Sequence, residues 1–81
     1  MTVRILFFSV LRDIIGQEEI AEEVSVGAGV TELLAQLYQR WPALGKWDSS
    51  LLVAVNQAYV KRDALIPENA EIALMPPVQG G

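Results

Sequence analysis

The two glycines at the end of the sequence, Gly80 and Gly81, are the residues whose type and position allow the most distinctive chemistry. Because glycine has no Cβ atom, such a pair can enter a channel barely wider than the backbone and adopt φ values closed to other residues. A carboxylate on Gly81 would be ionised at neutral pH and could attack an electrophile such as the α-phosphate of ATP. We therefore expect Gly81 to carry an acyl group that awaits activation.

The residues before the glycines predict an extended tail. A strand over Glu71–Met75 runs into Pro76 and Pro77, which fix φ and lack backbone donors, so that sheet pairing must stop there. We expect one domain over residues 1–75 and a tail over residues 76–81. The alternative is an ordinary frayed terminus, which most domains have.

The sequence lacks the residues that a self-contained active site usually needs. Its 81 residues include no histidine and no cysteine, which removes the commonest general base, the thiol nucleophile and the usual metal ligands. The acidic residues show no paired spacing typical of a metal or catalytic site. We therefore expect no activity of the chain on its own, no metal and no bound cofactor.

Charge and hydropathy exclude two classes of partner and favour a third. The net charge is −4, and the only basic cluster is Lys61-Arg62, which is too small for a nucleic-acid footprint. No uncharged run is long enough to span a membrane. Arg12 and Asp13 interrupt the apolar start without a cleavage site, so we expect a cytoplasmic protein. The apolar share of 52% indicates a protein partner.

The first stretch, Val3–Phe8, is rich in β-branched and aromatic residues and predicts a central strand. Val3, Ile5 and Phe7 share one face and would point into the core. The pattern alone leaves Phe8 open between the core and a partner interface.

A short helix is expected over Ser9–Gly16, with Ser9 as its N-cap and Gly16 ending it in the left-handed region. Alternation within Gln17–Val26 predicts a strand exposed on one side. Its four glutamates are expected to form a solvated edge without a catalytic role: Glu18, Glu19, Glu22 and Glu23.

The clearest helix is expected over Val30–Trp41, where one apolar stripe must lie on the sheet. Gly29 is the predicted N-cap with Glu32 at the third helical position, and the proline after Trp41 ends the helix. Tyr38 and Trp41 could form a ligand platform, but this spacing is more typical of core residues.

The remaining elements complete an α+β fold. A loop with one helical turn is expected over Ala43–Ser50, followed by a hairpin that turns at Asn56-Gln57, an exposed Lys61-Arg62-Asp63 segment and a left-handed turn at Asn69. One long helix across a mixed four- or five-stranded sheet is a β-grasp, ubiquitin-like arrangement. The first and last strands, as the most apolar pair, should lie parallel at its centre.

Several local motifs make the resemblance more specific. Phe7-Phe8 is followed by Leu11-Arg12-Asp13, Leu52 precedes Ala54-Val55-Asn56-Gln57, and the sequence ends in Met75-Pro76-Pro77-Val78-Gln79-Gly80-Gly81. Over essentially its whole length, the chain resembles the small subunit of molybdopterin synthase.

This resemblance implies a sulfur carrier. An E1-like adenylating enzyme would use ATP and Mg²⁺ to adenylate Gly81, and sulfur from a donor protein would replace AMP to leave a thiocarboxylate. The large subunit of molybdopterin synthase would hold the active site, where cyclic pyranopterin monophosphate receives the sulfur. Two small and two large subunits would form a heterotetramer.

The resemblance also implies which residues meet the large subunit. Phe8, Tyr59 and Met75 would form an apolar patch, and Arg12 would add a polar contact. The tail would contribute the rest of the interface through Pro76, Pro77, Val78, Gln79 and Gly80.

Three other functions stay open at this point. The chain could carry sulfur for another product such as thiazole, or it could be a ubiquitin-like modifier that forms isopeptide bonds to lysines. It could also be an interaction domain whose Gly-Gly ending has no chemical role.

Overall fold

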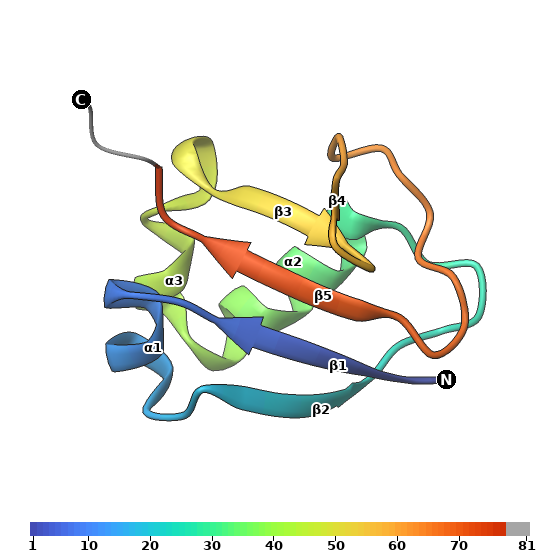
Figure 1. The fold of residues 1–81 in the computed structure, drawn as a ribbon. Coiled ribbons are helices and arrows are strands. Elements are labelled where there is room, and N and C mark those ends of the chain that lie inside the picture. Colours follow the sequence, from blue (N-terminus) through green and yellow to red (C-terminus); the bar gives the residue numbers. More distant parts are fainter. Residues whose placement is uncertain (78–81) are drawn as a thin grey trace.

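The computed structural model describes residues 1–77, which form one mixed sheet and four helical segments (Figure 1). The sheet has five strands in the order β2-β1-β5-β3-β4. The strands are β1 (Thr2–Phe7), β2 (Glu19–Glu23), β3 (Leu52–Val55), β4 (Ala58–Tyr59) and β5 (Glu71–Met75). The helices are α1 (Val10–Ile15), α2 (Val30–Arg40), α3 (Pro42–Gly45) and the 3-10 segment η1 (Asp48–Ser50).

The first and last strands lie side by side at the centre of the sheet, as predicted. β1 and β5 run parallel with Ile5 opposite Ile72, whereas the pairs β1–β2, β3–β5 and β3–β4 are antiparallel. Figure 1 shows α2 lying across one face of the sheet. This arrangement confirms the predicted α+β, β-grasp fold.

Alternation along the central strands separates the two faces of the sheet. In β1, Val3, Ile5 and Phe7 are buried against α2, and in β5 Ile72 and Leu74 are fully buried. The α2 stripe supplies the opposing apolar residues: Val30, Leu33, Leu34 and Leu37. The residues between the buried ones therefore point to the opposite face, which no helix of residues 1–77 covers.

The ends of α2 follow from local chemistry. The Gly29 amide donates to Glu32 Oε1 at 3.3 Å, as the predicted cap requires. The helix ends at Arg40, one residue before the predicted end, because Trp41 takes a non-helical conformation ahead of Pro42. The Trp41 ring packs edge-on against buried Phe7, 6.4 Å between ring centroids. Trp41 therefore belongs to the margin of the core and not to a ligand platform.

Ser9 occupies the N-cap position of α1, as predicted, but its side chain does not cap the helix. Ser9 has φ 57° and ψ −132°, and its side chain makes no cap hydrogen bond. The chain must turn from β1 into α1 between Phe8 and Val10 so that Leu11 reaches the core, and this turn takes the Ser9 backbone out of a capping conformation. The other end of α1 was correctly predicted, since Gly16 ends the helix in the left-handed region at φ 84°.

The expectation that all four glutamates form a solvated edge was wrong for Glu22, which is only 4% exposed. Alternation in β2 turns Glu22 to the same side as buried Ile20. There its carboxylate accepts hydrogen bonds from Arg40 and from Gln36 Nε2, the latter at 2.7 Å. An acidic residue is tolerated inside because two side chains of α2 satisfy it.

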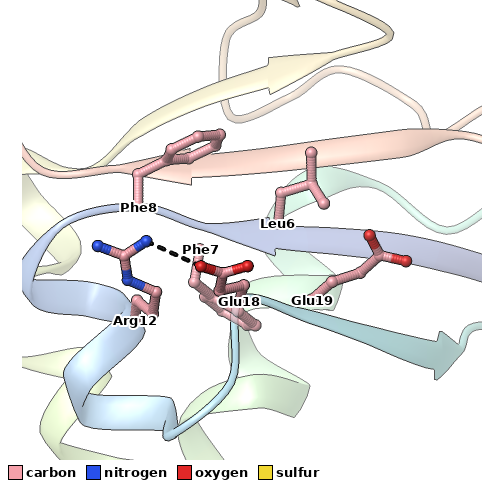
Figure 2. Close-up of a pocket in the computed structure, with 6 residues that line it drawn as sticks. All are labelled: Leu6, Phe7, Phe8, Arg12, Glu18 and Glu19. Carbon is pink, nitrogen blue, oxygen red and sulfur yellow. Dashed lines mark hydrogen bonds and ion pairs between the residues drawn. The ribbon is translucent and has the colours of Figure 1, made fainter.

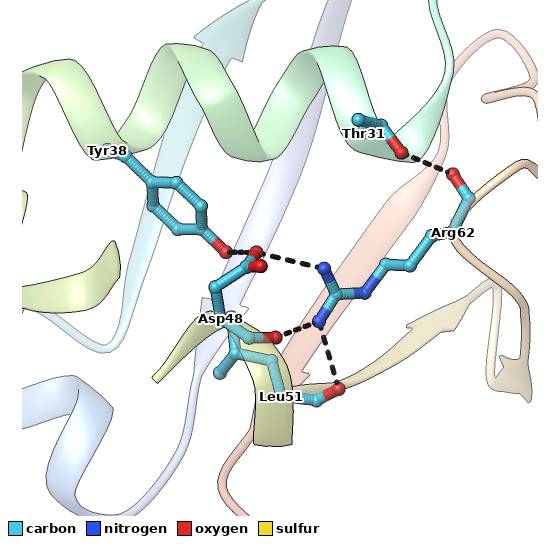
Figure 3. Close-up of polar contacts among 5 residues, drawn as sticks. All are labelled: Thr31, Tyr38, Asp48, Leu51 and Arg62. Carbon is cyan, nitrogen blue, oxygen red and sulfur yellow. Dashed lines mark hydrogen bonds and ion pairs between the residues drawn. The ribbon is translucent and has the colours of Figure 1, made fainter. Parts of the chain in front are cut away.

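The segment predicted as an exposed loop near residue 62 also differs from expectation. Arg62 is half-buried, and Figure 3 shows its guanidinium reaching Asp48 and the Leu51 carbonyl while its own carbonyl accepts from Thr31. The Asp48 carboxylate also accepts from the Tyr38 hydroxyl. These contacts tie α2, η1 and the segment after β4 together, a long-range arrangement that local polarity could not predict.

The last strand ends where the prolines begin. Met75 is the final residue of β5, and Pro76 and Pro77 follow it outside the sheet. The predicted tail residues Val78, Gln79, Gly80 and Gly81 lie outside the described residues. None of the helices found within residues 1–77 has the length and apolar character needed to cross a membrane.

Candidate functional site

An apolar hollow of about 360 Å³ lies on the helix-free face of the sheet. Two polar side chains, Gln57 and Glu71, border it. The apolar lining residues come from β1, β3, β4, β5 and the residue after β1: Leu6, Phe8, Ala54, Tyr59, Ala73 and Met75. The hollow therefore runs along β5 from Glu71 to Met75, after which the tail leaves the sheet.

The register of the central strands gives the hollow its position. Leu74 is buried in the core, so its neighbours Ala73 and Met75 face the hollow. The Phe8 amide donates to the Leu74 carbonyl at 3.3 Å, which extends the pairing of β1 and β5 by one residue. Phe8 is thereby held next to the end of β5, and Met75 is bonded directly to Pro76.

Two exposed aromatic side chains flank the hollow. Phe8 is 44% exposed and Tyr59 is 70% exposed, although large apolar residues are usually buried in a domain. Tyr59 lies on β4 opposite Ala54, on the far side of β5 from Phe8. Aromatic side chains in such a position are typical anchors of protein interfaces. The structure thus resolves the ambiguity over Phe8, which is outside the core.

Arg12 lies in a second, neighbouring hollow of about 280 Å³ (Figure 2). Its guanidinium Nη1 is 3.2 Å from Glu18 Oε1, across the connection from α1 to β2. Leu6 and Phe8 border both hollows. The structure therefore brings predicted interface residues Phe8, Tyr59 and Met75 together in one hollow and places Arg12 beyond Phe8 in the next.

A charged cluster on the same face adjoins both hollows, since Glu71 borders the first and Glu19 the second. The Arg4 guanidinium makes two 3.1 Å contacts to the Glu19 carboxylate and lies 3.5 Å from Glu71 Oε2. The hydrogen bond from Arg4 is the main cause that lowers the pKa of the Glu19 carboxyl, and the same bond raises the pKa of Arg4. The first hollow is thus bordered by charge at its Glu71 end and is apolar around Met75.

The chemistry of this surface suits recognition. Within residues 1–77, no three acidic side chains come together in a way that could hold a metal ion, and the sequence has no histidine or cysteine. The described residues offer an apolar hollow, two aromatic anchors and an arginine beside the exit of the tail. Such a surface can bind a partner and present the tail to it.

Five residues of the hollow were not predicted to belong to it: Leu6, Ala54, Gln57, Glu71 and Ala73. Leu6 and Ala73 could have been found by counting back two residues from Phe8 and Met75, because alternate residues of a strand share a face. Gln57 was predicted only as a turn residue, and no sequence signal would have placed its side chain in the hollow.

Known proteins match this chain over nearly its whole length. The model of the ThiS family matches residues 5–81. A molybdopterin synthase sulfur carrier subunit of Escherichia coli is 35% identical, over 98% of this chain and 99% of its own. One from Chlamydomonas reinhardtii is 34% identical over the whole of both chains. The crystal structure of SAMP1 from Haloferax volcanii is 25% identical with a TM-score of 0.85, covering all of both chains.

Proposed function

Since this chain belongs to the ThiS family, we propose that it is a sulfur carrier of molybdenum cofactor biosynthesis whose Gly81 carboxylate is converted to a thiocarboxylate. Its relatives from Escherichia coli and Chlamydomonas reinhardtii, both matched over nearly the full length, are sulfur carrier subunits of molybdopterin synthase. The observation that carries the proposal for this chain is the apolar hollow of Phe8, Tyr59 and Met75 directly beside the exit of the tail.

The loading reaction follows from carbonyl chemistry. A carboxylate is a poor electrophile, so a Gly81 carboxylate oxygen first attacks the α-phosphorus of ATP and pyrophosphate leaves, with Mg²⁺ and an E1-like enzyme assisting. Sulfide, or an equivalent from a donor protein, then attacks the acyl carbon, and the bond to the AMP oxygen breaks. The product is an anionic sulfur nucleophile on the carrier.

The large subunit of molybdopterin synthase is the partner that takes the sulfur. This chain has neither histidine nor cysteine, so proton transfer and substrate binding fall to that subunit. The hollow docks on it, and Gly80 and Gly81 enter its active site, where the sulfur passes to cyclic pyranopterin monophosphate. We expect two copies of each subunit in the complex.

Intact-protein mass spectrometry tests the proposal. The carrier is incubated with ATP, Mg²⁺, the E1-like enzyme and sulfide, and the expected result is a mass gain that corresponds to one oxygen replaced by sulfur. Fragmentation should place the gain on Gly81. A reaction without ATP is the control, because the carboxylate cannot be activated there.

Two results would contradict the proposal. An unchanged mass in the presence of an activating enzyme that loads another carrier would favour a simple interaction domain. Conjugates of the chain to lysine side chains of other proteins, in place of a thiocarboxylate that the large subunit accepts, would favour a protein modifier.

A further inference from the structure

In the turn between β3 and β4, Gln57 has a backbone conformation that is unfavourable for glutamine. Val55 pairs with Ala58, so Asn56 and Gln57 form a two-residue hairpin turn, with φ values of 50° and 72°. Two-residue turns with positive φ at both positions favour asparagine followed by glycine. Asparagine tolerates this conformation at the first position. The second position is occupied by Gln57, although glycine would be less strained there.

The fold does not use the Gln57 side chain. Asn56 already fixes the turn through two hydrogen bonds to the backbone of Glu71. The Asn56 side-chain oxygen accepts from the Glu71 backbone amide at 2.9 Å, and the Asn56 backbone amide donates to the Glu71 carbonyl at 2.8 Å. Gln57 is exposed, and its side-chain amide makes no hydrogen bond to any residue in the described range 1–77. Its presence at a strained position therefore has no explanation in the stability of the turn.

The position of Gln57 supplies an explanation. Its side chain borders the apolar hollow together with Phe8, Tyr59 and Met75. A glutamine offers two donors and one acceptor oxygen without a net charge. Once a partner covers the hollow, an uncharged amide there must find a hydrogen-bond partner or lose its hydration without compensation.

We propose that Gln57 is a specificity-determining residue of this surface, whose amide exchanges a hydrogen bond with a polar group of the large subunit when the hollow is covered. This inference rests on the proposed function, because it takes the large subunit as the occupant. Phe8, Tyr59 and Met75 provide apolar area, and Gln57 fixes the orientation in which the partner can cover it.

The substitution Gln57→Gly tests the proposal because it has opposite effects on folding and on binding. Glycine suits φ 72°, so the melting temperature of the free carrier should stay unchanged or rise. The loss of one interfacial hydrogen bond should weaken binding to the purified large subunit about three- to tenfold. Calorimetric titration of the two subunits measures the affinity.

Asn69→Gly is the matched control. Asn69 also has a positive φ, 58°, and is exposed, but it lies in the turn before β5 and does not border the hollow. Its replacement should leave the affinity for the large subunit unchanged. The comparison separates the loss of the Gln57 amide from a general effect of adding a glycine.

Each other outcome overturns the inference. Equal affinities of wild type and Gln57→Gly would show that the amide makes no contact, and a fall in both stability and affinity would show that Gln57 serves the fold. If the wild-type carrier itself fails to bind the large subunit, the proposed function fails as well.

Discussion

Asp48 accepts hydrogen bonds from two side chains that are distant in the sequence, Tyr38 and Arg62. The bond from Tyr38 is the main cause that lowers the pKa of the Asp48 carboxyl, and Arg62 lowers it further. Burial, followed by the bond to Asp48, raises the pKa of Tyr38, so the hydroxyl keeps its proton at neutral pH. One carboxylate therefore connects α2, η1 and the segment after β4.

This contact predicts a pH dependence of stability. A carboxyl whose folded-state pKa is lowered stabilises the fold at pH values above its unfolded pKa of about 4, and this stabilisation is lost as the pH falls through the lower folded value. Asp48→Asn should therefore be less stable than wild type at pH 7, with a difference that shrinks below about pH 4. Urea unfolding at several pH values measures it, and a difference that stays constant with pH would contradict the assignment.

At the scale of elements, the pair Glu22–Arg40 joins the edge strand β2 to α2. The two partners differ in burial, since the Glu22 side chain is 5% exposed and that of Arg40 is 54% exposed. Removal of Arg40 leaves a buried carboxylate with Gln36 as its remaining partner, whereas removal of the charge on Glu22 leaves an arginine that water can solvate.

Arg40→Ala should therefore cost more stability than Glu22→Gln, about 2 kcal/mol or more against about 1 kcal/mol. Chemical denaturation of both variants and of the double variant measures the difference. Arg40 also stacks over the Trp41 ring, 4.3 Å from its centroid, and the double variant separates this contribution. Equal costs of the two single substitutions would contradict the role of Glu22 as a buried charge.

The face formed by β1, β5, β3 and β4 carries a second prediction at this scale. Phe8→Asp places a charge in the apolar hollow and should weaken binding to the large subunit at least tenfold, because buried aromatic anchors dominate interfaces. The fold should be unaffected, since Phe8 is already 44% exposed. Val26→Asp is the control, because Val26 is 75% exposed and borders neither hollow. Unchanged affinity of Phe8→Asp by calorimetry would remove the hollow from the interface.

At the scale of the whole molecule, the folded core and the proposed chemistry occupy different parts of the chain. The cluster of buried residues extends from Val3 to Leu74, and the last strand ends at Met75. Deletion of Gly81 should therefore abolish sulfur loading without a measurable change in melting temperature. Mass spectrometry tests the loss of sulfur loading, and a thermal melt tests the unchanged stability. A large fall in melting temperature would show that the tail contributes to the fold.

The sequence by itself determined the main features of this protein. Apolar periodicity placed the long helix and the central strands, because burying one face of each element is the main stabilising term of a small domain. The absence of histidine and cysteine left the chain without the commonest general base and without a thiol nucleophile, and the two prolines marked the end of β5. These signals are local, and they depend on residue type and spacing alone.

The tertiary structure alone decided which distant residues meet. It placed Phe8 outside the core and buried Glu22 against α2. It also gave Ser9 a positive φ without a side-chain cap, and brought Gln57 into the same hollow as Met75. Each of these depends on strand register and on the packing of elements far apart in the sequence. The local sequence around a glutamate does not distinguish a solvated edge from a buried ion pair, because the partner residue that makes the difference lies on another element.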